Sequence, residues 1–330
     1  MKHFISLILS FFIVLSMCMM SCKASRQSVE RTAEKSAMIS HDTVNYVPWD
    51  NSLLWEISFP NNQIESSYIF GTIHMIESER FFYPKGTKEA LSRTKEVFFE
   101  IDMDEMSNVG SQIGMMGKLF MKDGMTLEDL MDEDDYLRVA EFFSDKGLPM
   151  MFVNKIKPMF LASMTEMDME SMGMFGKGDE ESNIKSYEME LYNLAIANEI
   201  EVSGLETMKF QIQLFDGIPY EVQAEMLVQA VEDSGSEESA KMMEELVDVY
   251  LSQNIEGLVS TIQQDDSMAR YEQMLLTDRN KNWIPIIESK ISKQKTFFAV
   301  GAGHLAGPNG VLNLLRQKGY TVKPLSVSNE

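Results

Sequence analysis

Two of the four histidines end copies of the same short pattern, Gly-Thr-Ile-His at residues 71–74 and Gly-Ala-Gly-His at residues 301–304. Each copy follows an apolar run that is typical of a buried strand, at 68–70 and at 297–300. Imidazole nitrogens bind metal ions and exchange protons near neutral pH. The pattern therefore predicts a metal site or an acid–base site formed by His74 and His304 just past two strands.

The glycines of these motifs have their own expected roles. Gly71 and Gly301 could turn the chain sharply at the strand ends, with φ values that other residues avoid. Gly303 could let the backbone approach a ligand closely.

Acidic side chains end two further candidate strands. Glu100 and Asp102 lie at the end of the run 96–101, and Glu206 follows the run 199–205. Ligands of open α/β sheets bind beyond the carboxyl ends of the strands. If these strands are parallel neighbours, two imidazoles and two or three carboxylates converge, which suits a metal site with room for water. Asp102 is explained as well by a helix cap or a solvated position.

Strands alternate with helical segments, which predicts an α/β fold with a mixed central sheet flanked by helices. Residues 47–330 are expected to form this domain, starting with a hairpin of strands at 53–59 and 67–71. Further strands are predicted at 96–101, 199–205, 296–300 and 320–324. Helices are predicted at 87–95, 126–146, 158–169, 183–198, 220–231, 237–252, 255–268, 274–290 and 310–318.

A methionine-rich helical insertion is predicted at about 103–180. Residues 103–174 contain 15 of the 28 methionines. Thioethers at 167, 169, 172 and 174 could bind a soft cation such as Cu(I). Plain packing, or an adaptable apolar groove for a peptide or lipid-like ligand, explains the same composition.

The N-terminus resembles a bacterial lipoprotein signal peptide over residues 1–22, with a short polar start and an apolar run at 4–20. Cys22 follows a small residue, as a lipidated cysteine does, whereas bulky Met17 precedes Cys18. An ordinary signal peptide or an uncleaved anchor is the alternative. Residues 23–46 then form a flexible tether. The expected location is the bacterial cell envelope, lipid-anchored to the outer membrane and facing the periplasm or the surface.

The formal net charge of −22 and the lack of a basic stripe argue against nucleic acid as a partner. The two cysteines lie in the predicted signal, so the mature domain is expected to have neither disulfides nor thiol chemistry.

Several motifs taken together resemble the TraB/GumN (TraB/PrgY/GumN) family over residues 47–325, and that family is similar to the Tiki metalloproteases. The resemblance is carried by the two GxxH motifs, Glu100 to Asp102, Gly204 to Thr207 with Gln211, Arg279 and Asn280 with Trp283, Gly307-Pro308 and Gly319-Tyr320.

The resemblance implies a divalent-metal hydrolase, peptidase-like, with Mn²⁺ or Co²⁺ favoured and Zn²⁺ possible. His74, His304 and Glu100 would bind the cation, and Glu206 or Glu100, whichever is not bound to the metal, would act as general base. Arg279 would stabilise the oxyanion. Gln211 and Asn280 are expected to support the site, as are Gly71, Gly301 and Gly303.

Two other functions compete with a lipid-anchored hydrolase of peptides or proteins. One is a non-catalytic protein of the cell envelope that binds and sequesters a peptide signal. The other is a helper in envelope polysaccharide production, which only the GumN name suggests.

Overall fold

The computed structural model describes residues 46–59, 65–104, 117–165, 183–263 and 271–325, together with Gly110 and Gly114. A six-stranded sheet in the order β6-β4-β7-β2-β1-β8 forms its centre. The strands are β1 (Leu54–Ser58), β2 (Ser67–Thr72), β4 (Glu96–Ile101), β6 (Glu201–Glu206), β7 (Thr296–Gly301) and β8 (Thr321–Pro324).

Four of these strands run parallel and two run antiparallel to their neighbours. β6, β4, β7 and β2 are parallel to one another, so the residues that follow them emerge at one edge of the sheet. β1 pairs antiparallel with both β2 and β8. The three central parallel strands are almost wholly buried, which explains their continuous apolar runs. The predicted α/β fold with a mixed sheet is confirmed.

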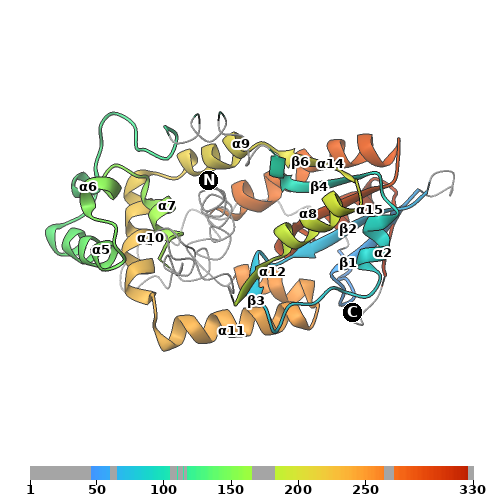
Figure 1. Cartoon of the computed structure of the whole chain (residues 1–330), viewed down its shortest axis with the longest axis horizontal. Coiled ribbons are helices and arrows are strands. Elements are labelled where there is room, and N and C mark those ends of the chain that lie inside the picture. Colours follow the sequence, from blue (N-terminus) through green and yellow to red (C-terminus); the bar gives the residue numbers. More distant parts are fainter. Residues whose placement is uncertain are drawn as a thin grey trace, which may run out of the picture.

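Helices flank the sheet and extend the molecule to one side (Figure 1). The α-helices are α2 (Thr87–Ser92), α5 (Glu133–Asp145), α6 (Met150–Val153), α7 (Pro158–Ala162), α8 (Tyr187–Ala197), α9 (Met208–Leu214), α10 (Tyr220–Asp233), α11 (Glu237–Leu251), α12 (Ile255–Gln263), α14 (Asp278–Ile291) and α15 (Val311–Gln317). Short 3₁₀ turns are η2 (Leu127–Asp129), η3 (Phe215–Gly217) and η5 (Ala302–His304), and η4 (Gln273–Thr277) is a π-helical turn.

A second, small ribbon pairs β3 (Met75–Glu77) with β5 (Ile184–Ser186). The predicted helix over 183–198 therefore begins later, at Tyr187, because its first residues pair with β3. Ser186 is the N-cap of α8, and its side chain accepts from the Met189 N–H.

The helix predicted over 126–146 also divides. Thr126 and Asp129 form the expected capping box, but it closes only the single turn η2. A new cap at Asp132, whose side chain accepts from the Asp135 N–H, starts α5. Two capping signals six residues apart thus give two elements where periodicity alone suggested one helix.

The helical part carries a core of its own. α5, α6 and α7 gather with α10 at the end of the molecule away from the sheet (Figure 1). Val139, Phe143, Val153 and Leu161 are buried there against Leu227 of α10. A pair between Lys157, almost fully buried, and Asp216 joins this part to η3. Helix packing and one buried ion pair connect it to the rest of the chain.

The predicted signal peptide, most of the tether, Cys22 and the methionines at 167, 169, 172 and 174 lie outside the described residues. Within the described residues, no helix is both long and apolar enough to cross a membrane.

Close packing between β4 and β6 gives a test of the fold. A β-carbon at Gly204 would lie 2.3 Å from the Asp102 backbone nitrogen and 2.8 Å from the Glu206 carbonyl oxygen. Backbone atoms cannot rotate away, so Gly204→Ala should lower the free energy of unfolding by about 3 kcal/mol. A urea titration measures this change. Gly117→Ala, where the added carbon meets nothing within 4 Å, is the control. Equal unfolding midpoints for both variants would contradict the packing.

Candidate active site

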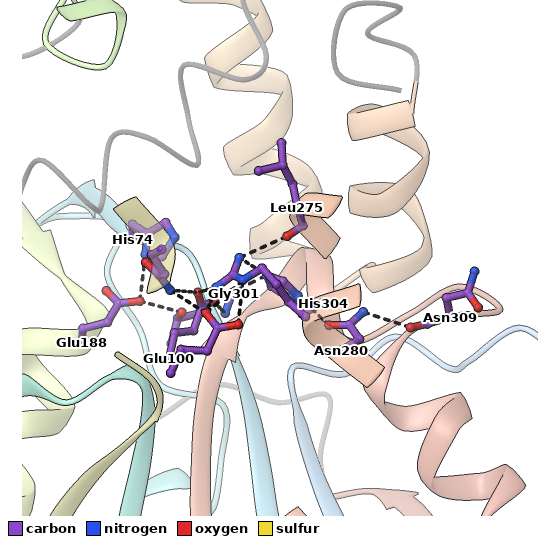
Figure 2. A network of polar contacts seen from close by, with 12 residues as sticks. His74, Glu100, Glu188, Leu275, Asn280, Gly301, His304 and Asn309 are labelled. Atoms are coloured by element: carbon purple, nitrogen blue, oxygen red, sulfur yellow. Dashed lines mark hydrogen bonds and ion pairs between the residues drawn. The ribbon is translucent and has the colours of Figure 1, made fainter. Parts of the chain in front are cut away.

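The two GxxH motifs lie side by side because β2 and β7 are parallel neighbours. Their register pairs Gly71 with Val300 and Thr72 with Gly301. A β-carbon at Gly301 would lie 3.2 Å from Glu100 Oε1, 3.6 Å from His304 Cδ2 and 3.9 Å from His74 Nε2. Both histidines and the β4 carboxylate therefore surround one glycine, and Figure 2 shows them together.

Space, and not a left-handed φ, explains the two strand-end glycines. Gly301 has φ −53°, and Gly71 is not among the positive-φ residues of the described chain. A β-carbon at Gly71 would lie 2.6 Å from Leu305 Cδ1 and 3.0 Å from Ala302 Cα. Gly71 thus lets the second motif pack directly on the first. Gly303 lies in the half-buried middle of η5.

Asn280 of α14 fixes the ring of His304. The Asn280 Nδ2 donates to the Asn309 carbonyl at 2.9 Å, which leaves the Oδ1 to accept from His304 Nδ1 at 2.6 Å. His304 Nε2 is then unprotonated and accepts from Arg279 Nη1 at 3.2 Å. The Trp283 ring packs on the His304 ring with 4.5 Å between centroids.

Glu188 of α8 fixes the ring of His74 in the same way. Its Oε1 accepts from His74 Nδ1 at 3.0 Å and from the Thr72 hydroxyl at 2.7 Å. His74 Nε2 therefore faces Gly301. Both imidazoles turn the same nitrogen toward the centre while an acceptor holds the other, as in metal sites whose outer residues orient the ligands.

Glu100 sits between the two rings. Its Oε1 accepts from the Gly301 N–H at 2.8 Å and lies 3.8 Å from His304 Nε2. Its Oε2 accepts from Arg279 Nη2 at 2.6 Å, with Gln211 Nε2 at 3.4 Å.

Arg279 joins the two carboxylates. Its Nε lies 3.1 and 3.0 Å from the two oxygens of Glu206, and its Nη1 donates to the Leu275 carbonyl at 3.2 Å. Gln211 Nε2 donates to Glu206 Oε2 at 3.1 Å. The predicted residues Glu206, Arg279 and Gln211 thus form one network with Glu100.

Burial and neighbouring charges shift the pKa values of the two histidines in opposite directions. Burial lowers the pKa of His74, but the charge and hydrogen bond of Glu188, with Glu100 behind them, raise it overall. Burial lowers the pKa of His304 to about 3; the negative charge of Glu100 opposes this shift, and the charges of Arg279 and His74 add to it. Burial would raise the pKa of Glu100, yet Arg279, His304 and His74 hold it well below its ordinary value. Glu100 is therefore ionised and His304 neutral at neutral pH.

Asp102 lies just past β4 and accepts from the Asp104 N–H at 2.9 Å, a capping contact that matches the simpler of its two expected roles. Two members of the network were missed from the sequence. Thr72 lies inside the first motif, and Glu188 is one of several acids in a charged helix. Glu188 gives no local signal, because only the β3–β5 pairing brings it to His74.

The donor types fit a divalent cation. The His74 Nε2, the His304 ring and a carboxylate oxygen of Glu100 face a glycine whose missing side chain leaves space among them. As the described side chains stand, however, no three His, Cys, Asp or Glu residues are grouped to hold a metal ion. The Arg279 contact uses the His304 Nε2 lone pair, so His304 can serve as a ligand only after Arg279 releases it.

The two buried carboxylates depend on Arg279, which gives a stability prediction. Replacing it in Arg279→Met leaves Glu100 and Glu206 buried without their cation and should cost about 3–5 kcal/mol of unfolding free energy. Arg93→Met removes an exposed pair with Glu89 and should cost about 1 kcal/mol or less. Chemical denaturation of both variants measures the difference, and an Arg279→Met cost no greater than the control's would refute the charge balance.

Two metalloproteases are among the relatives of this chain. The chain is 23% identical to Metalloprotease TIKI2 of Danio rerio over 83% of its own length and 61% of that protein. It is 22% identical to Metalloprotease TIKI1 of Homo sapiens over 95% of its own length and 69% of that protein. The chain thus spans about three-fifths of the Danio rerio relative. No solved structure gives a significant match.

A sequence model of the TraB/PrgY/gumN family matches residues 53–324. That span runs from the residue before β1 to the end of β8 and includes both GxxH motifs, Glu100, Glu206 and Arg279. The chain belongs to the TraB/PrgY/gumN family.

Proposed function

We propose that this protein is a divalent-metal-dependent hydrolase of peptides or proteins, with His74, His304 and Glu100 as the residues that bind the cation. The observation that carries the proposal is the shared orientation of the two imidazoles. Each has its Nδ1 held by an acceptor; the His74 Nε2 then faces Gly301, and the His304 Nε2 lies 3.8 Å from Glu100 Oε1. The relatives named metalloproteases support the same reaction class.

A bound divalent cation would supply a Lewis acid and lower the pKa of a water molecule. The chain's own residues prepare the site for this chemistry. Glu100 stays ionised because Arg279 holds its pKa low, so it suits a ligand better than a proton acceptor. His304 stays neutral, which keeps a lone pair on its Nε2.

Arg279 is placed to stabilise negative charge on a reacting oxygen. Its guanidinium is buried beside His304, and Glu100 and Glu206 hold it in place. Once its Nη1 has released the His304 Nε2, a guanidinium held by two carboxylates can stabilise an oxyanion with little further reorganisation. Both oxygens of Glu206 lie against Arg279, so its contacts favour orienting Arg279 over acting as general base.

Metal content and peptide cleavage test this function together. His74→Ala and His304→Ala should each weaken binding of Mn²⁺, Co²⁺ and Zn²⁺ by at least about 100-fold and abolish cleavage of a diverse peptide mixture. His41→Ala, in the predicted tether, is the control and should match the wild type. Cleavage is followed by mass spectrometry with and without chelator.

Two results would count against the proposal. Equal metal content in the wild type, His74→Ala and His304→Ala would show that these two histidines are not metal ligands. Metal binding without any metal-dependent peptide product would favour the non-catalytic protein that sequesters a peptide signal.

We further propose that Cys22 carries a lipid that anchors the protein to the outer membrane of a bacterial cell envelope. The support is the short apolar run at 4–20, the small residue before Cys22 and the polar sequence after it. The acidic domain would then be held off an anionic membrane by residues 23–46.

Substitution of each cysteine separates the two candidate lipidation sites. Cys22→Ser should abolish incorporation of labelled fatty acid and release the protein from the membrane fraction. Cys18→Ser should leave labelling unchanged. Labelling that survives Cys22→Ser and is lost in Cys18→Ser would move the anchor to Cys18, and labelling lost in neither would refute lipidation.

A further inference from the structure

We propose that Glu188 is the positioning residue that selects the tautomer of His74 and aims its Nε2 into the active site. The metal-related part of this inference rests on the proposed function, whereas the tautomer itself does not. His74 and Glu188 are separated by 114 residues in the chain, and both side chains are 14% exposed. A contact between two mostly buried groups so distant in sequence depends on the fold and not on local chain geometry.

The Glu188 carboxylate is held by three donors. Its Oε1 accepts from the Thr72 hydroxyl at 2.7 Å and from His74 Nδ1 at 3.0 Å, and its Oε2 accepts from the Ser186 hydroxyl at 3.1 Å. The two hydroxyls restrict the carboxylate to one orientation. The second lone pair of Oε1 accepts from His74 Nδ1, so the orientation of the carboxylate sets the orientation of the imidazole ring.

The β3–β5 ribbon brings the pair together. β3 begins directly after His74, and β5 ends two residues before Glu188. Their antiparallel register places Met75 opposite Ser186, so the next residues outward on the two strands are His74 and Tyr187. The first turn of α8 then carries Glu188 back over the ring. The pairing of β3 with β5 therefore places a carboxylate of α8 next to the first GxxH motif.

A carboxylate accepts hydrogen bonds and cannot donate them, so its contact with Nδ1 requires a proton on that nitrogen. In the neutral imidazole the Nε2 then carries the lone pair. That nitrogen lies 3.9 Å from the β-carbon position of Gly301, at the centre of the site. Without Glu188 the proton could occupy either nitrogen, and an Nε2–H would turn a donor where a metal ligand needs a lone pair.

His304 provides an internal comparison. Its Nδ1 is held by the neutral Asn280 amide, which the Asn309 carbonyl orients in turn. Both histidines thus present Nε2, one through a charged acceptor and one through a neutral acceptor. A carboxylate partner increases the basicity of the imidazole more than an amide does. The two rings of the site are therefore unequal donors, with His74 the stronger.

Histidine ¹⁵N chemical shifts in the metal-free full-length protein test the tautomer directly. The chain has four histidines, so the spectrum is simple, and His74→Gln assigns the signal. At alkaline pH, where the imidazole is neutral, the wild type should show His74 protonated at Nδ1 alone. Glu188→Ala should lose this preference, and Glu188→Gln, which keeps the volume and a neutral acceptor, should retain part of it. Glu190→Gln, on the same first turn but paired with Lys185, is the matched control and should change nothing.

Binding of Mn²⁺, measured by electron paramagnetic resonance, provides the second readout. Glu188→Ala should weaken Mn²⁺ binding by about 10–100-fold, and the helical circular dichroism signal should be unchanged. An Nδ1–H tautomer that persists in both Glu188 variants, or an Nε2–H tautomer in the wild type, would overturn the positioning role. A tautomer that shifts as expected in a protein that binds no Mn²⁺ would support the positioning role and refute the proposed metal site.

Discussion

The buried guanidinium of Arg279 is the charge on which the site depends. Two carboxylates from neighbouring strands, Glu100 of β4 and Glu206 of β6, end at the same buried edge of the sheet, where their repulsion and loss of hydration are costly. Arg279 offsets both by contacting each carboxylate. The π-helical turn before α14 places the Leu275 carbonyl within 3.2 Å of Arg279 Nη1, so the backbone also orients this side chain. A π turn at such a place is common at functional sites.

Arg279 balances the charge of the site, and the parallel pairing of β2 and β7 sets the positions of its residues. It sets Gly71 beside Val300, and the absence of a side chain on Gly71 lets Ala302 pack against it. Tyr250 of α11 then donates to the Gly71 carbonyl at 3.0 Å from within a cluster of buried aromatic rings. Strand register, a close backbone approach and aromatic packing therefore fix where the two motifs lie relative to each other. The positions of the two imidazoles follow from this strand pairing and packing.

Much of this arrangement could be predicted from the sequence because its signals are local. Each GxxH motif follows a continuous apolar run, and Glu100 and Glu206 each end one, so placement at one sheet edge follows once the strands are parallel. The helix over 220–231 and the strand over 96–101 needed only periodicity and composition. Element starts were harder where two local signals competed, as at Thr126 and Asp132, or where tertiary pairing claimed the first residues of a helix, as at Ile184. Glu188 could not be found, because nothing in its neighbourhood distinguishes it from the other acids of an acidic chain.

The site contains residues that face its centre and residues that orient them, and the two sets come from different parts of the fold. His74, His304 and Glu100 face the centre, whereas the groups that orient them come from distant helices: Glu188 from α8, Asn280 and Arg279 from α14. The two motifs are not equivalent in the sheet, because the β2–β7 register pairs Gly71 with Val300 and is therefore offset by one residue from the motif alignment. His74 also directly precedes strand β3, whereas His304 lies in the 3₁₀ turn η5. The orienting groups add a further difference: against the effect of burial, Glu188 raises the pKa of His74, whereas burial lowers the pKa of His304 and the charge of Arg279 adds to that shift. The chemical difference between the two histidines therefore arises both from the local geometry of each motif and from the distant helices that supply the orienting groups.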